Sequence, residues 1–385
     1  MKTKTTISNS TSTLYTSLDL HSRTSVFGVM NQAGKMLSTT RVDTKASNLK
    51  QVIEDLPEGH RIELTLEAAP MARWAHGVLA DLVDRIVICD PRSNRLISQS
   101  AIKNDEADVI ALCRLLRMNE LHEVWMSENE PRTVFHDLLF DLLKLRDQQR
   151  QLKTLIKTRF QAFGVLRLDG KEVFHPDKRY RWIEKLPPHR RHSIEQLYLL
   201  LDTTLGAWKD QMREVNRSGK SFPEIARFQE VPGVAEVGAA VFSAFVQDPD
   251  RFISGSQLCR YAALGITSRS SDGKPLGYER LDRRGQRELK NMSYHAWRTG
   301  IRRGHQCDVL RQFYDTSTTR TGSKRHARLN TQRKVIKTLW SMWKNETHFD
   351  PDTFLQTPEP ELVLELKPRR RRRRRRSRSP RGVQI

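Results

Sequence analysis

The sequence lacks several features that would assign it to familiar protein classes. No run of eighteen or more apolar residues occurs among its 385 residues, so no membrane-spanning helix is expected. The N-terminal segment lacks the apolar core of a secretory signal. The four cysteines stand far apart with no CxxC pair, which argues against a zinc knuckle or a disulfide framework. We therefore expect a cytoplasmic protein of two or three domains, each held together by its own core.

Motifs for two common hydrolase classes are also missing. His21, His76, His136 and His295 stand in no HxxxH or HExxH spacing, so a zinc hydrolase is not indicated. No GxxxxGK[ST] or GxGxxG occurs, which argues against nucleotide hydrolysis.

Positive charge, in contrast, is abundant. The formal net charge is +22, and the rest of the chain still carries +11 without the arginine run 369–376 and its three flanking cations. Cations that neutralise phosphates release condensed counterions, so a polyanion is the leading partner. A solvated basic surface is the alternative. The arginine run by itself predicts a flexible tail and does not identify a function.

The first part of the chain has the pattern of a mixed α/β sheet. Residues 14–30 and 35–42 predict three strands joined by turns, and residues 62–68 and 85–90 predict two more. Helices are expected between these later strands and at 104–117, where acidic residues begin the helix.

Helical periodicity follows from Pro131 onward. Apolar residues at three-and-four spacing predict one long helix, a loop over 164–189, and a second helix that begins at Ser193 with Gln196 three residues later. Together these form a helical hairpin that resembles a coiled coil, serving either as a spacer or in subunit pairing.

The C-terminal part is expected to be mainly helical. Pro232-Gly233 precedes a helix rich in small residues, in a form that resembles a helix-hairpin-helix. Another helix is expected over 255–266. A polar, glycine-bearing loop and a helix from 286 come next, and the end from 346 is expected to be flexible. The predicted domains are thus 1–128, 129–225, 226–345 and a tail 346–385.

Four carboxylates form the strongest candidate site. Asp19 lies in a predicted strand, where carboxylates are disfavoured, and Glu67 ends another strand. Asp105 and Asp108 lie three residues apart at a helix start and face one side. If they converge, their repulsion calls for hard cations such as Mg²⁺, and paired Mg²⁺ ions suit phosphodiester chemistry. Glu63, on the same strand face as Glu67, is a weaker alternative.

A second candidate lies in the polar loop. Ser270 and Ser271 precede Asp272-Gly273, and a serine there could attack phosphorus while nearby cations stabilise the developing charge. A basic turn without chemistry is the alternative. The cations predicted to bind nucleic acid are Arg269, Lys274, Arg280, Arg283 and Arg284.

Two blocks of sequence resemble one family. LDLH around Asp19, LTLEAA around Glu67, CDPRSNR, and KNDEADVIAL with Asp105 and Asp108 form the first block. VPGVAEVGAAVFSAF, DRFISGSQLCRYAALGI and SSDGKPLGYERLDRRGQRELK form the second. In this order they resemble the DEDD-type transposases of the insertion-sequence one-ten family, the bridge-RNA-guided recombinases, over residues 14–300.

The resemblance implies a function that composition does not. It implies a RuvC-like first domain, of the ribonuclease-H type, whose four acids bind Mg²⁺, and a C-terminal serine that forms a phosphoserine bond with DNA. It also implies a guide RNA that pairs with donor and target DNA. The active site would join the acids of one subunit to the serine of another, in a dimer or tetramer. A prokaryotic, nucleoid-associated enzyme is then expected.

The sequence departs from the family in two places. Family members carry serine directly before glycine in this loop, whereas here Asp272 precedes Gly273. We predict Ser271 as the nucleophile, with Ser270 second, and an inactive copy if Asp272 replaces it. The arginine-rich end is also unlike the family's.

Two other functions stay open at this point. A metal-dependent RuvC-like endonuclease or junction resolvase would use the acids without serine chemistry. A non-catalytic nucleic-acid-binding protein would need only the basic surface.

Overall fold

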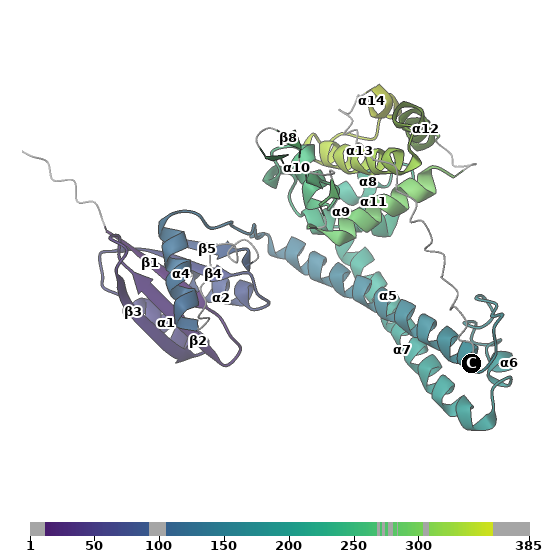
Figure 1. The fold of residues 1–385 in the computed structure, drawn as a ribbon, viewed down its shortest axis with the longest axis horizontal. Coiled ribbons are helices and arrows are strands. Elements are labelled where there is room, and N and C mark those ends of the chain that lie inside the picture. The colour runs from purple at the N-terminus through teal and green to yellow at the C-terminus, as the bar shows by residue number, and fades with distance from the viewer. Residues whose placement is uncertain are drawn as a thin grey trace, which may run out of the picture. The chain divides into compact units, whose positions relative to one another are not determined.

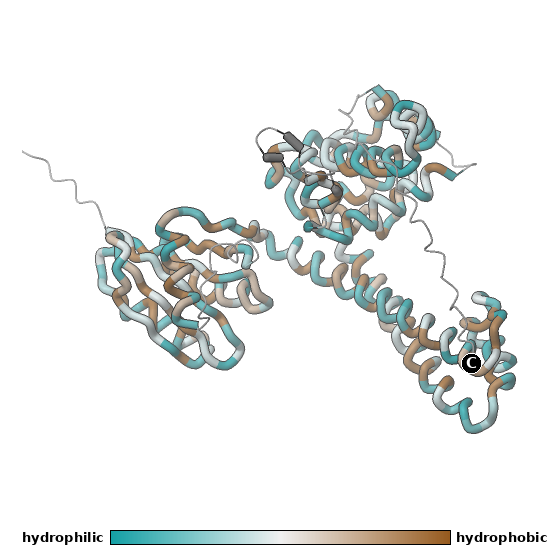
Figure 2. The backbone as a smooth tube through the Cα atoms, viewed as in Figure 1, coloured by the Kyte–Doolittle hydropathy of each residue, from teal (hydrophilic) through white to brown (hydrophobic). Residues whose placement is uncertain are grey.

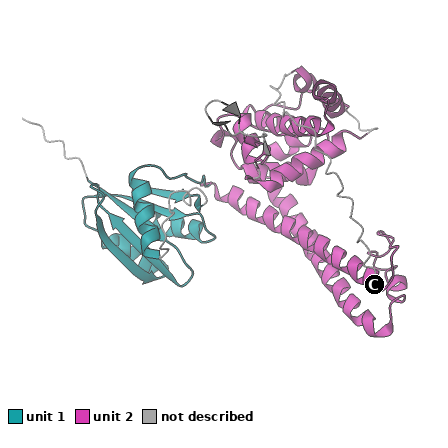
Figure 3. Ribbon diagram, in the orientation of Figure 1, with its two compact units in different colours: residues 1–126 teal, residues 127–385 magenta. Residues whose placement is uncertain are grey.

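The computed structural model describes residues 12–91, 105–267, 270–271, 274–275, 280–282, 284–302 and 308–356. Two compact units divide the chain, residues 1–126 and residues 127–385 (Figure 3). We describe each unit by itself.

The first unit is a five-stranded mixed sheet with helices on both faces (Figure 1). Its strands are β1 (Thr13–Asp19), β2 (Thr24–Met30), β3 (Met36–Asp43), β4 (Arg61–Glu67) and β5 (Arg85–Cys89). Its helices are α1 (Ala46–Glu54), α2 (Ala72–Leu79) with the 3₁₀ turn Ala80–Leu82, and α4 (Asp105–Arg117). The predicted strands and helices of this region are confirmed.

The strand order is β3-β2-β1-β4-β5, which makes β1 the point where the sheet changes direction. β1 pairs antiparallel with β2 but parallel with β4, and β4 pairs parallel with β5. The carboxyl ends of β1, β4 and β5 therefore meet at one edge. In open α/β sheets, ligands bind at this edge.

The two faces of the sheet carry different side chains. Leu18 and Leu66 are fully buried in a core that includes Leu49 of α1 and Ala75 of α2. Burial of a leucine side chain contributes about 1.5–3 kcal/mol to folding. Figure 2 shows the apolar residues, in brown, recurring along the strands of the sheet.

On the other face, α4 packs closely over two small residues, Ser17 and Gly28. Ser17 Oγ donates a hydrogen bond to the Val109 carbonyl at 2.7 Å. Cys113 Sγ lies 3.2 Å from Ser17 Oγ and 3.3 Å from the Gly28 carbonyl oxygen, and burial raises its pKa to about 11. A Cβ at Gly28 would stand 3.0 Å from Ser17 Oγ and 3.1 Å from Val109 Cβ. Gly28 therefore sets how near α4 lies to the sheet.

The second unit is almost entirely helical in its described residues. Its hairpin consists of α5 (Glu130–Ala162), α6 (Tyr180–Ile183) and α7 (Pro188–Gly219). The remaining helices are α8 (Glu224–Phe228), α9 (Glu236–Val246), α10 (Gly255–Tyr261), α11 (Arg287–Gly300), α12 (Val309–Thr321), α13 (Lys324–Lys344) and α14 (Pro351–Gln356). Four two-residue strands, β6 (Ile266–Thr267), β7 (Ser270–Ser271), β8 (Lys274–Pro275) and β9 (Arg280–Leu281), lie between α10 and α11.

The hairpin has a core of its own at its tip. Ile156 and Phe160 of α5 pack there with Trp182, Ile194 and other buried residues. Elsewhere, residues of α5 join the large core of the helices that follow, as Phe135 does with Phe222 at 4.9 Å between ring centroids. The division into a separate hairpin and C-terminal domain at residue 225 stays a prediction.

Several predicted boundaries in this unit are wrong. The second hairpin helix begins at Pro188 and not at Ser193, because proline fits the first turn of a helix. The short helix α6 lies within the expected loop 164–189. The helix predicted over 255–266 ends at Tyr261.

The polar loop and the C-terminal end also differ from expectation. Part of the loop forms the short strands β7, β8 and β9, and β6 lies directly before it. The expected flexible end contains α14, because Phe354 is buried against Phe313 and Phe349. The arginine run lies outside the described residues.

We predict that Gly28→Ala destabilises the first unit by about 1–3 kcal/mol, because the added methyl group pushes α4 from the sheet. Gly77→Ala is the matched control. Nothing lies within 4 Å of a Cβ at Gly77 in α2, so this change should stabilise by about 0.5–1 kcal/mol. Urea unfolding of the two variants measures both effects, and equal shifts of the same sign would contradict the close approach.

Candidate functional site

The candidate site lies at the carboxyl edge of the sheet, where β1 ends at Asp19. Side chains alternate along a strand, so Asp19 shares the α4 face with Ser17, whereas Leu18 faces the opposite core. Asp19 pairs with Val26 of β2, and Val26 pairs with Arg41 of β3. These three residues therefore form one row across the sheet.

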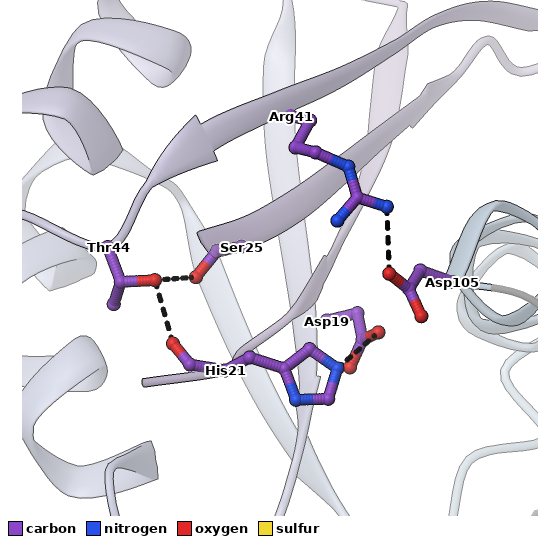
Figure 4. Close-up of polar contacts among 6 residues, drawn as sticks. All are labelled: Asp19, His21, Ser25, Arg41, Thr44 and Asp105. Atoms are coloured by element: carbon purple, nitrogen blue, oxygen red, sulfur yellow. Dashed lines mark hydrogen bonds and ion pairs between the residues drawn. The ribbon is translucent and has the colours of Figure 1, made fainter. Parts of the chain in front are cut away.

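Asp105 reaches this row from the first turn of α4. Its Oδ2 accepts a hydrogen bond from an Arg41 guanidinium nitrogen at 2.8 Å (Figure 4). That hydrogen bond lowers the pKa of Asp105. The pair is exposed, so it contributes little to stability and its strength falls with salt.

His21 completes the cluster. Its Nε2 lies 3.1 Å from Asp19 Oδ2, and the imidazole in Figure 4 points at that carboxylate. Asp19, His21 and Asp105 each offer one ligand atom, and these atoms all lie within 4.8 Å of one another. Two carboxylates and an imidazole within that span can bind a divalent cation.

The environment of Asp19 favours its protonated form. Burial is the largest effect that raises the pKa of Asp19, and the negative charges of Asp105 and Asp108 raise it further. The neighbouring His21 opposes these effects. A bound cation would offset both the desolvation and the repulsion, so the residues present fit a metal site.

Asp108 and Glu67, the other two predicted metal ligands, are related to this cluster by charge and by strand register, respectively. Asp108, half-buried on α4, acts on Asp19 through its charge. Glu67 follows Leu66, the parallel partner of Leu18, and is the pairing partner of Cys89 in β5. The register places Glu67 beside Asp19 at the same edge and on the same face. The roles of all four acids remain predictions.

Glu63 lies away from the edge. It is paired with Tyr15, near the opposite ends of the parallel strands, about 13 Å along β4 from Glu67. Its carboxylate forms ion pairs with Arg61 at 3.4 Å and Arg85 at 3.6 Å. The Glu63 carboxylate is therefore paired with two arginines, away from the candidate site.

The predicted serines lie in the second unit, on strand β7. Ser270 pairs with Pro275 and Ser271 with Lys274 of β8, in antiparallel register. The structure describes only the backbone of these residues and of Arg280. Asp272, Gly273, Arg269 and Arg283 lie outside the described residues.

Arg284 is the one predicted nucleic-acid-binding cation whose side chain the structure describes. Its Nε lies 3.3 Å from Asp282 Oδ1, and its backbone N–H donates to the same oxygen at 2.9 Å. The side chain is 77% exposed, so it is open to a polyanion although it already has an acidic neighbour.

Comparison with known proteins bears on this second unit. Residues 225–315 match the model of the transposase IS116/IS110/IS902 family, and this range contains Ser270 and Ser271. This part of the chain is therefore similar to the transposase domain of this family. The family that the sequence resembled is thereby confirmed.

One curated relative extends the similarity. A putative transposase, y4qE, of Sinorhizobium fredii (strain NBRC 101917 / NGR234) is 22% identical over 239 residues. The alignment covers 60% of this chain and 57% of the relative. The chain thus spans little more than half the length of that protein. Within the described residues, no helix is both long and apolar enough to cross a membrane.

Sequence reasoning missed His21 and Arg41 as members of the site. His21 stands two residues after Asp19 in LDLH, and this spacing could have indicated it. Arg41 reaches Asp105 only through the register of three strands, which no local pattern encodes.

We predict that Asp19→Asn raises the melting temperature of the metal-free protein at pH 7 by about 2 °C, a small value because the Asp19 side chain is 24% exposed and solvent screens it. The raised pKa means that the folded chain holds a proton on Asp19 more tightly than the unfolded chain. This contribution to stability is present at low pH and is lost as the pH rises through the raised pKa.

The gain from Asp19→Asn should therefore vanish near pH 3, where wild-type Asp19 is itself protonated. Asp43→Asn, which removes an exposed carboxylate that pairs with Lys45, is the control and should show no gain at pH 7. Thermal unfolding in EDTA across this pH range checks the result. A lower melting temperature of Asp19→Asn than of the wild type at pH 7 would contradict the claim that burial and neighbouring carboxylates disfavour the charged form of Asp19.

Proposed function

We propose that this protein is the transposase of a mobile element, which cuts and rejoins DNA. The observation that carries the proposal is the family match over 225–315, which contains the serine strand, in one chain with an acidic cluster at a sheet edge. The first unit is a mixed sheet with α4 on one face, which is compatible with the RuvC-like fold we propose for it.

We propose that Asp19, Glu67, Asp105 and Asp108 hold Mg²⁺, with His21 beside them. The cation, when bound, would polarise the phosphate and stabilise the oxygens that enter and leave. Arg41 neutralises Asp105 in the metal-free protein, and its exposed guanidinium could pair with a phosphate once released. Glu67 ends β4 at the same edge, where it can complete the carboxylate set.

Ser271, with Ser270 as the second choice, would supply the nucleophile. Its oxygen forms a bond to phosphorus, and the bond from phosphorus to a sugar oxygen breaks. The displaced sugar oxygen takes up a proton, which balances the proton that the serine loses. A hydroxyl of another strand then reverses the exchange and frees the serine. Arg269, Lys274, Arg280, Arg283 and Arg284 would hold DNA near this strand.

The partners we propose are donor DNA, target DNA and a guide RNA that pairs with both. The net charge of +22 supports polyanion partners. If a guide RNA pairs with the DNA bases, the protein needs no side chains that recognise the DNA sequence. We place such an enzyme in the cytoplasm, with the nucleoid.

We also propose that the active site joins two copies of the chain, in a dimer or tetramer. The hairpin supports this assembly, because it exposes large apolar side chains. Leu155 of α5 is 40% exposed, and Leu199 and Leu200 of α7 are 59% and 55% exposed. Exposed leucines on a helical hairpin are typical of a surface that pairs with another copy.

The test is a denaturing gel of the full-length protein with labelled DNA, its flanking RNA and Mg²⁺. We expect a covalent protein–DNA adduct in the wild type. The adduct should fall at least 10³-fold in Ser271→Ala, which loses the nucleophile, and in Asp105→Asn, which loses a metal ligand. Asp43→Asn removes an exposed carboxylate that pairs with Lys45 and is not one of the three clustered ligands Asp19, His21 and Asp105, so it should form the adduct at the wild-type level.

Each other outcome identifies a different function. Cleavage without adduct, unchanged when Ser270 and Ser271 are both replaced by alanine, would show the metal-dependent nuclease. Salt-sensitive binding with no cleavage, unchanged by Asp105→Asn, would show a non-catalytic binding protein. An adduct that is lost in Ser270→Ala but kept in Ser271→Ala would identify Ser270 as the nucleophile.

A further inference from the structure

The described residues that precede and follow the serine-bearing segment are paired with each other. β6 and β9 pair, with Ile266 opposite Leu281 and Thr267 opposite Arg280. The Asp282 amide donates to the Gly265 carbonyl at 2.9 Å, and the Gln286 amide donates to the Tyr261 carbonyl at 2.6 Å. We call residues 261–267, 280–282 and 284–286 the arm base, since Ser270 and Ser271 lie between its two sides in the sequence.

The returning chain passes very close to the end of α10. Gly285 has φ +123°, and a Cβ there would stand 2.5 Å from the Tyr261 carbonyl oxygen. Only glycine combines this backbone conformation with such an approach. The two sides of the arm base are therefore held in backbone contact.

The outgoing side of the arm base is strained. Ala263 has φ +55°, in the left-handed region that a residue with a Cβ rarely adopts. The Leu264 amide donates to the Cys259 carbonyl at 2.9 Å, which closes the end of α10. Such a conformation persists where the surrounding structure holds it.

A buried arginine contacts this strained turn from α13. Arg333 is 7% exposed, and its Nε donates to the Leu264 carbonyl at 2.9 Å. One of its terminal nitrogens donates to Asn330 Oδ1 at 3.2 Å, and Asn330 Nδ2 in turn donates to Ser317 Oγ of α12 at 3.2 Å. A buried hydrogen-bonded chain thus runs from α12 through α13 to the arm base.

Burial of a guanidinium is costly, and an apolar side chain of similar size often stabilises a core as well or better. Arg333 is therefore poorly explained by stability alone. Its planar, multiple donors fix the direction of a carbonyl in a way that an apolar residue cannot. Leu264 lies directly before Gly265, where the chain leaves for the serine strand.

We propose that Arg333 is a positioning residue that fixes the arm base. Through the arm base it would fix the position and orientation of the Ser270–Ser271 strand relative to the DNA phosphate. This inference rests on the proposed function. Arg333 itself touches no reacting atom. It acts through Leu264, and a displacement of about 1 Å at a nucleophile costs on the order of 10²-fold in rate.

Arg333→Met in the full-length protein tests the proposal, with Lys334→Met as the matched control. Lys334 is the next residue on α13 and is 5% exposed, but its ammonium lies 5.3 Å from the Phe354 ring centroid, toward α14. Both variants remove one buried cation. Only Arg333→Met should affect the arm base.

The first readout needs no catalysis. We expect Arg333→Met to speed hydrogen exchange at the amides of Asp282 and Gln286 about 10-fold, and to leave peptides of the α5–α7 hairpin unchanged. Lys334→Met should leave both regions at wild-type rates. Unchanged exchange in Arg333→Met, or an equal change in Lys334→Met, would overturn the anchoring.

The second readout is the adduct. In Arg333→Met its rate should fall about 10²-fold while DNA affinity stays within about twofold, and Arg333→Lys should recover part of the rate. A wild-type adduct rate in Arg333→Met would overturn the positioning role. Absence of adduct from the wild-type protein would instead refute the proposed function, and the exchange result would still decide the anchoring.

A second variant covers the case in which Arg333→Met fails to fold. Asn330→Ala keeps the guanidinium but removes the side chain that orients it. It should raise the hydrogen-exchange rate at the arm base about threefold. It should also lower the adduct rate, as Arg333→Met does. Wild-type values in Asn330→Ala would then overturn the proposal.

Discussion

The close packing of α4 on the sheet is the constraint on which the acidic cluster depends. Ser17 and Gly28 leave room on the sheet for α4, whose Cys113 lies against them, and the hydrogen bond from Ser17 to the Val109 carbonyl fixes the position of α4 along the strands. This packing brings the first turn of α4, with Asp105, to the end of β1, with Asp19. A larger residue at position 17 or 28 would push α4 from the sheet and separate the carboxylates of Asp19 and Asp105.

The same geometry gathers like charges, and the fold offsets them only partly. Arg41 pairs with Asp105 and His21 with Asp19, yet the pKa of Asp19 stays above its usual range because burial and two carboxylates outweigh the imidazole. A site that is stabilised by a cation and strained without one suits metal-dependent chemistry. The second unit carries strain as well, at Ala263, in the turn that follows α10 and precedes the serine strand.

Much of the first unit could be predicted from its sequence, because hydrophobic alternation marks strands and the acidic turn marks the start of α4. Asp19 was conspicuous as a carboxylate in a strand. Arg41 was not, since its proximity to Asp105 arises from cross-strand register. The strand β7, which consists of Ser270 and Ser271, is two residues long and too short for any periodicity. Arg333 could not be found either, because a basic residue within a helix predicts an exposed position, and only tertiary packing buries it.

The most direct measurement of the central claim is anomalous scattering from crystals of the protein soaked in Mn²⁺, a stand-in for Mg²⁺. The account predicts a peak within about 2.3 Å of carboxylate oxygens of both Asp19 and Asp105, with the Arg41 guanidinium displaced from Asp105. A peak elsewhere on the chain, or none while the Arg41–Asp105 ion pair stays intact, would contradict it.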